Sequence, residues 1–104
     1  MILTRYYLGL TTRAGNPVTK LQRACVTGRM AQAYGGGCTF YHAKGYWQGE
    51  CEDTLILEAV ADDTPDSLRP VPDVLARELG TIMEQDTVLW TAERVAAGFV
   101  KVQP

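Results

Sequence analysis

His42, the single histidine of the chain, stands on one side of a predicted bend, and a group of carboxylates stands on the other. Glu50, Glu52 and Asp53 follow the bend closely. If the flanking segments pair as a hairpin, a histidine–carboxylate pair for general acid–base catalysis is geometrically conceivable across it. No nucleophile accompanies the pair, so His42 can equally be a surface residue on a half-exposed strand. The sequence therefore assigns no catalytic residue.

The same region contains residue types that bind metals, but not in a diagnostic pattern. His42 and Cys51 are suitable ligands, yet no Cys-x-x-Cys pair occurs among Cys25, Cys38 and Cys51. If the bend is centred near Trp47, Cys38 and Cys51 lie several residues apart along the ladder, beyond disulfide reach. We expect three free thiols, no metal site and no cofactor.

Two aromatic residues occupy the bend. Gly45 and Gly49 bracket Tyr46 and Trp47, and a loop of this kind can project aromatic side chains away from its domain. The two rings can anchor a subunit contact, or they can form a platform on which an aromatic ligand stacks, with Lys44 or Arg5 for an anionic group. The residues expected to bind a ligand or partner are Tyr41, His42, Lys44, Tyr46, Trp47 and Glu50.

Hydrophobic periodicity predicts the elements that position these residues. Alternating or β-branched runs predict strands over residues 2–11, 38–44, 54–61 and 87–92. Helical spacing predicts one helix over 17–34, with an apolar stripe that includes Val18, Leu21 and Cys25. A second helix begins at Pro70 or Pro72 and ends near residue 83. The run of three glycines at 35–37 ends the first helix.

The element order β-α-β-β-α-β favours a ferredoxin-like sandwich of the α+β class. Such a fold has a four-stranded antiparallel sheet of order 4-1-3-2 with two helices on one face. We expect one domain over residues 1–93, and a C-terminal tail or short edge strand over 94–104.

The second face of this sheet is predicted to be too apolar to be left in water. A second copy of the same surface is the simplest cover, so we expect a homo-oligomer. Arg5 and Glu58 lie on central strands that should be neighbours, and we expect them to pair. The expected interface consists of Arg5, Tyr7, Ile56 and Glu58.

Charge and composition exclude some classes of partner. The net charge is −2, and the ten Lys and Arg residues are scattered, which argues against a general nucleic-acid or anionic-membrane surface. No signal peptide or membrane span is visible, so we expect a cytoplasmic protein.

Two segments carry a resemblance to known proteins. The hairpin sequence from Gly45 to Glu58 and the segment from Gln85 to Leu89 resemble uncharacterised βαββαβ proteins of bacteria and bacteriophages. These in turn resemble PII-type signalling proteins and CutA. The resemblance implies a trimer rather than a dimer, and a subunit cleft beside the hairpin loop that can receive a small anionic or aromatic ligand such as a nucleotide. The loop length differs from PII proteins, and no basic phosphate-binding run is present.

Two functions follow as hypotheses. The first is a non-enzymatic, oligomeric binding or regulatory protein of the PII-like kind, whose hairpin loop and subunit cleft engage a ligand or partner. One variant is a bacteriophage protein that sequesters a host nucleotide or binds a host protein. The alternative is a small enzyme of the dimeric α+β barrel type that uses His42 with a nearby carboxylate.

Overall fold

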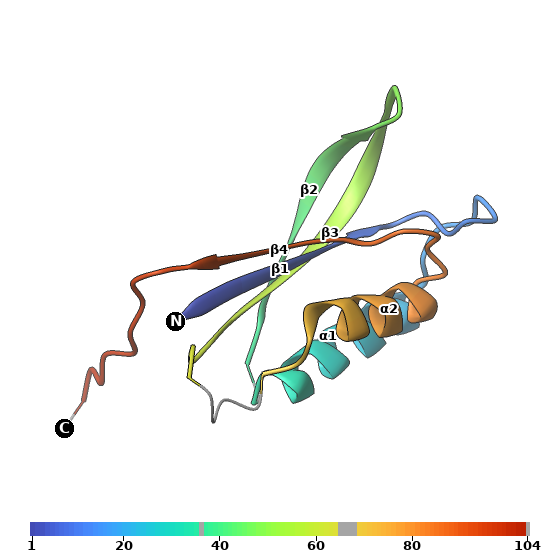
Figure 1. Cartoon of the computed structure of the whole chain (residues 1–104). Helices are drawn as coiled ribbons and strands as arrows, with labels where there is room; N and C mark the ends of the chain where they lie inside the picture. Colours follow the sequence, from blue (N-terminus) through green and yellow to red (C-terminus); the bar gives the residue numbers. More distant parts are fainter. Residues whose placement is uncertain (36, 65–68, 104) are drawn as a thin grey trace.

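The computed structural model describes residues 1–35, 37–64 and 69–103. Its sheet has the strand order β2-β3-β1-β4 with antiparallel pairing throughout, and both helices lie on one face of that sheet (Figure 1). The predicted α+β fold and strand order are confirmed. In chain order the elements are β1 (Ile2–Gly9), α1 (Lys20–Ala33), β2 (Thr39–Trp47), β3 (Glu50–Ala61), α2 (Pro72–Ile82) and β4 (Leu89–Arg94).

The hydrophobic core lies between the sheet and the helices. Alternate residues of β1 and β3 point toward the helices, as expected for strands with one buried face. The largest side chains without solvent exposure are Tyr6, Leu8 and Leu57 from the sheet, Met30 from α1, Leu79 from α2, and Met83 just after it.

Helix α1 begins three residues later than predicted. Thr19 caps it, because its hydroxyl accepts a hydrogen bond from Gln22 N (3.1 Å) and Gln22 Oε1 accepts one from Thr19 N (2.8 Å). Val18 stays outside the helix because its N–H donates to Leu10 O (2.9 Å). The predicted apolar stripe is also wrong: Leu21 and Cys25 are exposed, and the buried residues of the helix are Val26 and Met30.

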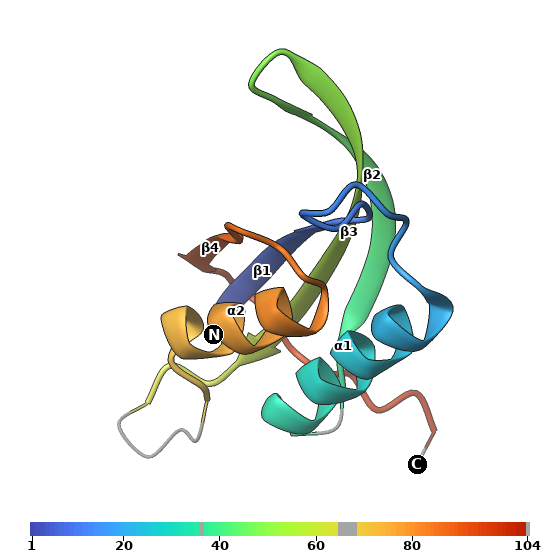
Figure 2. The same ribbon diagram turned by 90° about the vertical axis from the view of Figure 1, so that its right-hand side faces the viewer.

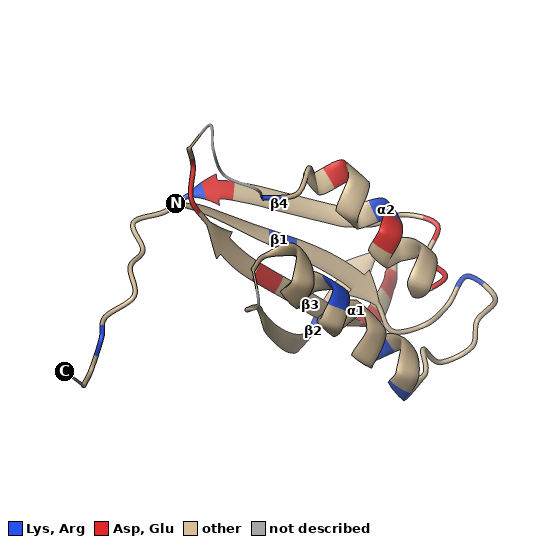
Figure 3. Ribbon diagram, turned by 90° about the horizontal axis from the view of Figure 1, so that it is seen from below, with Lys and Arg blue, Asp and Glu red and all other residues tan. Residues whose placement is uncertain are grey.

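The end of α1 agrees with the glycine signal. Gly35 follows Tyr34 with a φ of 77°, a left-handed conformation that glycine adopts without strain. Gly36 lies outside the described residues. The helices pack side by side, and Arg29 of α1 forms an ion pair of 2.7 Å with Glu78 of α2. Seen from the helix side, α1 carries basic residues whereas α2 carries both signs (Figure 3).

The predicted bend is a tight turn at the tip of a long hairpin. Gln48 and Gly49 have φ values of 48° and 83°, and two consecutive positive φ values are typical of a two-residue type I′ turn. Tyr46 therefore pairs with Cys51, so the centre predicted near Trp47 was wrong. Strand β1 ends opposite Thr54, and residues 44–53 project beyond it as a two-stranded arm (Figure 2).

Strand β4 ends at Arg94, and residues 95–103 form neither helix nor strand. Val95 is attached to the start of the chain, because its N–H donates to Met1 O (2.9 Å). Beyond it the segment leaves the sheet (Figure 1). Cys25, Cys38 and Cys51 are all free thiols. None of the helices in the described part of the chain is long and apolar enough to cross a membrane.

Candidate ligand-binding site

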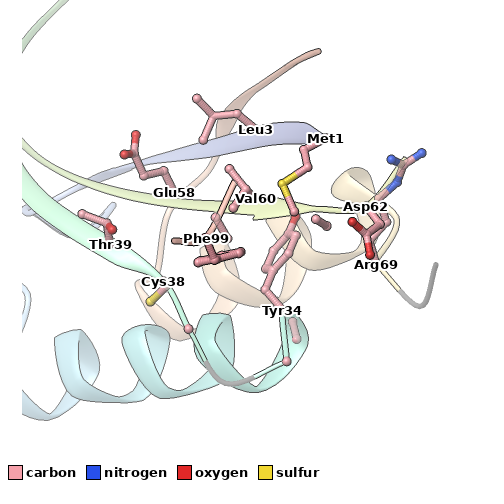
Figure 4. Close-up of a pocket in the computed structure, with 15 residues that line it drawn as sticks. Met1, Leu3, Tyr34, Cys38, Thr39, Glu58, Val60, Asp62, Arg69 and Phe99 are labelled. Atoms are coloured by element: carbon pink, nitrogen blue, oxygen red, sulfur yellow. The ribbon is translucent and has the colours of Figure 1, made fainter. Parts of the chain in front are cut away.

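A cavity of about 690 Å³ lies at the end of the sheet where β1 begins and β3 ends. Its walls come from the central strands, the end of α1 and the segment that follows β4 (Figure 4). This volume is within the range of small-molecule sites in proteins. Its lining includes two carboxylates, one arginine, one thiol and two aromatic rings, namely Glu58, Asp62, Arg69, Cys38, Tyr34 and Phe99.

Glu58 belongs both to this cavity and to the sheet face that the helices leave open. Its Oε2 accepts hydrogen bonds from Arg5 Nε (3.0 Å) and from the Tyr41 hydroxyl (3.2 Å). Arg5 and Glu58 are direct partners in the β1–β3 register, so the strand alignment brings them together. The predicted pairing of Arg5 with Glu58 is confirmed.

Arg5 also binds a second carboxylate. Its Nη1 donates to Glu93 Oε1 of β4 (3.0 Å). The hydrogen bond to Glu58, and to a smaller extent the one to Glu93, raises the pKa of Arg5 further above its ordinary value. The guanidinium therefore stays charged and holds Glu58 in place at the edge of the cavity.

Tyr34 is the C-cap residue of α1 and brings an aromatic ring to the cavity. Its hydroxyl lies 2.8 Å from the hydroxyl of Tyr6, and the two rings are tilted by 56° with centroids 6.5 Å apart. Tyr6 has no solvent exposure. Its burial, together with the Tyr34 hydroxyl, raises its pKa well above the ordinary value, so it stays protonated. The core thus positions Tyr34.

The other end of the cavity carries a charged cluster. Arg69 Nη1 donates to Asp63 Oδ1 (3.2 Å), and Arg94 Nη2 lies 3.0 Å from Asp63 Oδ2. Figure 4 shows Asp62 and Arg69 toward one end and Glu58 toward the other.

Tyr34, Phe99 and Cys38 occupy the region between these ends (Figure 4). Burial raises the pKa of the Cys38 thiol, whose Sγ donates to Thr27 O (3.8 Å), so this cysteine is a protonated wall residue. The cavity therefore combines separated charges with aromatic surface.

The structure separates the six residues expected to bind a ligand or partner. Tyr41 is the one that joins the Glu58 network. His42 is exposed and pairs with Leu55. Because successive side chains of a strand point to opposite faces, His42 lies on the other face of the sheet from Tyr41 and Glu58. In the described part of the chain, no carboxylate forms an ion pair with His42.

The remaining four of the six lie on the arm. Lys44 forms an ion pair with Asp53, whose hydrogen bond raises the pKa of Lys44. Tyr46 and Trp47 are 77% and 63% exposed, and Glu50 faces Trp47 across the turn. Within the described ranges, no cluster of three or more His, Cys, Asp or Glu could hold a metal ion.

The residues expected at an oligomer interface share one sheet face but differ in exposure. Arg5 and Glu58 are paired and half-buried. Tyr7 is also half-buried and lies opposite Ile56, which is 7% exposed. Ile56 is thus already covered within a single chain.

Sequence reasoning missed Tyr34 and Phe99 as site residues. Tyr34 was only the end of a predicted helix, and Phe99 lay in the C-terminal tail. An aromatic residue directly before a glycine run was the one local signal for Tyr34, since such a position lies at a helix end near a turn. Phe99 has no comparable signal.

Comparison with known proteins gives a match at the level of fold. No protein-family model and no curated protein matches the chain. A solved structure of phage SAM lyase in complex with S-methyl-5′-thioadenosine is similar, with a TM-score of 0.63 and 15% sequence identity over 88% of this chain and 79% of that chain. Phage SAM lyase in the apo state is also similar, with a TM-score of 0.58 and 16% identity over 88% of this chain and 78% of that chain.

These matches correct two expectations. The prediction of a non-enzymatic binding or regulatory protein is wrong, because both similar structures are named as an enzyme, which favours the alternative of a small enzyme. The resemblance to PII-type and CutA proteins receives no support from them, whereas the resemblance to a small bacteriophage protein does. The chain has the fold of a small phage protein.

Proposed function

We propose that the chain is an enzyme that binds S-adenosylmethionine (SAM) in the cavity at Glu58 and cleaves it to release S-methyl-5′-thioadenosine. The observation that carries this proposal is the composition of the cavity, which offers the Glu58 carboxylate and two aromatic rings in one space of about 690 Å³. The similar ligand-bound structure is of a protein named for this substrate and holding this thioether.

Two parts of SAM, the sulfonium and the adenine, have chemically suitable partners there. The sulfonium is a cation and suits the Glu58 carboxylate, which hydrogen bonds from Arg5 and Tyr41 hold in place. The adenine suits an aromatic surface.

The reaction itself needs few protein groups. When the bond between sulfur and the amino-acid side chain breaks, both electrons stay on sulfur and a neutral thioether leaves. The four-carbon fragment either receives an electron pair from its own carboxylate and closes to a lactone, or loses a neighbouring proton and becomes an alkene. Both products have the same mass, and proton NMR distinguishes them.

The two routes give Glu58 different roles. In ring closure the positive charge on sulfur decreases toward the transition state, so a carboxylate beside it binds the substrate better than it accelerates the chemistry. Glu58→Gln then mainly raises KM. In elimination the Glu58 carboxylate is the candidate base, and the same substitution mainly lowers kcat.

The test is release of S-methyl-5′-thioadenosine from SAM by the purified protein, measured by liquid chromatography and mass spectrometry. Glu58→Gln should lower kcat/KM by about 10- to 100-fold, the effect of losing a charged hydrogen-bonding group. Glu93→Gln is the matched control, because Glu93 also binds Arg5 but does not line the cavity. Its kcat/KM should stay within about threefold of the wild type.

Two results would contradict the proposal. Wild-type protein that is folded but leaves SAM intact overturns the activity. Equal losses in Glu58→Gln and Glu93→Gln would place the effect at Arg5 rather than at the cavity.

A further inference from the structure

Phe99 combines two properties that are unusual in one residue. It lines the cavity, and its side chain is nevertheless 87% exposed. It lies on the irregular segment after β4, which is attached through the backbone hydrogen bond between Val95 and Met1. An aromatic ring at a cavity with most of its surface in water has contact area left for a ligand.

Tyr34 presents a second ring to the same cavity, and this ring contacts the buried core. Its hydroxyl forms a hydrogen bond with the hydroxyl of the buried Tyr6. Within the described residues, the ring of Tyr6 is also the aromatic ring that the Tyr34 ring contacts. The rings of Tyr34 and Phe99 therefore border one space without packing on each other (Figure 4). A flat aromatic group is the kind of ligand that fills such a space.

We propose that the purine ring of a nucleoside ligand stacks between Tyr34 and Phe99. This inference rests on the proposed function, and it assigns the adenine subsite of the same cavity. Tyr34 is the fixed surface, placed by the core. Phe99 is the surface contributed by the segment after β4. Stacking uses the faces of the rings and reads no base edge, so this subsite distinguishes aromatic from non-aromatic ligands more than one purine from another.

The charged ends of the cavity support this assignment. Glu58 lies toward one end and Arg69 toward the other, and the two rings occupy the part between them (Figure 4). A neutral, planar base is better matched to this middle part than a charged group is, because a charge there would lose water without gaining a partner.

The test uses S-methyl-5′-thioadenosine and adenosine as probes, with binding measured by titration calorimetry. Phe99→Ala should weaken binding of both by about 10- to 100-fold, the usual effect of removing one stacking ring. Phe99→Trp should restore it. Val102→Ala is the matched control, because Val102 lies on the same segment, is 89% exposed and does not line the cavity.

Variants at Tyr34 test the second ring. Tyr34→Phe keeps the ring but loses the hydrogen bond to Tyr6, so it should lower the affinity less than Tyr34→Leu does, with circular dichroism showing that both are folded.

The outcomes separate this inference from the proposed function. If the wild type binds S-methyl-5′-thioadenosine and Phe99→Ala binds it equally well, the proposed stacking site is wrong, and this result does not contradict the proposed lyase activity. If the wild type leaves SAM intact but binds adenosine, and Phe99→Ala binds adenosine more weakly, the stacking site is supported and the proposed function is wrong. Wild-type protein that binds neither probe at millimolar concentration overturns the inference.

Discussion

Individual side chains in this protein connect the core to the cavity. Tyr6 is fully buried, and its hydroxyl is the partner of Tyr34, whose ring borders the cavity. Glu58 has a comparable position on the sheet, since Arg5 holds it from the neighbouring strand. In both cases a residue that does not line the cavity determines where a lining residue sits. Substitutions at Tyr6 or Arg5 should therefore affect ligand binding indirectly.

The raised pKa of Tyr6 predicts a loss of stability in alkali. An exposed tyrosine titrates near pH 10, whereas burial and the Tyr34 hydroxyl keep Tyr6 protonated in the fold. The unfolded chain therefore loses this proton first as the pH rises above about 10. The stability due to Tyr6 is complete below that pH and decreases above it.

Tyr6→Phe tests this relation, with urea unfolding measured between about pH 8 and pH 11. At neutral pH the variant should be less stable by about 1 kcal/mol, because Tyr34 loses its hydrogen-bond partner. Above pH 10 its stability should fall less steeply than that of the wild type. Tyr46→Phe, at an exposed position, should follow the wild-type curve. Parallel curves for Tyr6→Phe and the wild type would contradict the assignment.

Among the elements, the β2–β3 arm stands apart from the rest. In the described part of the chain no third strand pairs with it beyond Thr54, and an isolated two-stranded hairpin is marginally stable in water. The tight turn at Gln48 and Gly49 and the ion pair between Lys44 and Asp53 support it. Trp47 remains 63% exposed at its tip. We therefore propose that Trp47 contacts a partner molecule or another copy of the chain.

Trp47→Ala should leave the fold almost unchanged, because an exposed side chain contributes within about 0.5 kcal/mol to the free energy of unfolding. Circular dichroism and thermal unfolding measure this, and light scattering measures any loss of self-association. Gly49→Ala is the contrast, since its φ of 83° strains any residue with a Cβ and should cost about 1 kcal/mol or more. If Trp47→Ala unfolds the protein, Trp47 belongs to the core of its own chain.

For the whole molecule, the helices cover one face of the sheet and leave the other open (Figure 1). We propose that this open face packs against further copies of the chain. Ile56, expected at the interface, is only 7% exposed within a single chain. Ile56→Asp would therefore bury a charge in that chain and unfold it. Leu89 is the better probe, because it lies opposite Tyr7 on the same face and is 59% exposed.

Leu89→Asp should reduce the mass measured by light scattering from a multiple of 11.4 kDa toward 11.4 kDa itself, with an unchanged circular dichroism spectrum. A charge in the centre of an apolar contact loses its water without a partner, which separates the copies. Thr19→Ala is a control away from this face; it should weaken the cap of α1 by about 1 kcal/mol and leave the mass unchanged. A folded Leu89→Asp variant with the wild-type mass, or a monomeric wild type, would contradict this interface.

The sequence by itself determined the order of elements, the sheet topology and the pairing of Arg5 with Glu58. These features follow from local periodicity, since alternation marks strands, and the βαββαβ order leaves few ways to arrange them. The hairpin register was misplaced because it depends on backbone angles at Gln48 and Gly49, and a glutamine gives no signal for a positive φ. The start of α1 was misplaced for a similar reason, since a long-range hydrogen bond to Leu10 keeps Val18 out of the helix.

Only the tertiary structure decided the site. Tyr34 gains its role from a contact with Tyr6, 28 residues away, and Glu58, Arg69 and Phe99 line one cavity because their chain segments come together at the same end of the sheet. Periodicity reports which face of an element is buried, but it does not report which ends of elements converge. His42 shows the converse, since the carboxylates close to it in sequence suggested an acid–base pair. Alternation along β2 instead places its side chain on the opposite face of the sheet from Glu58.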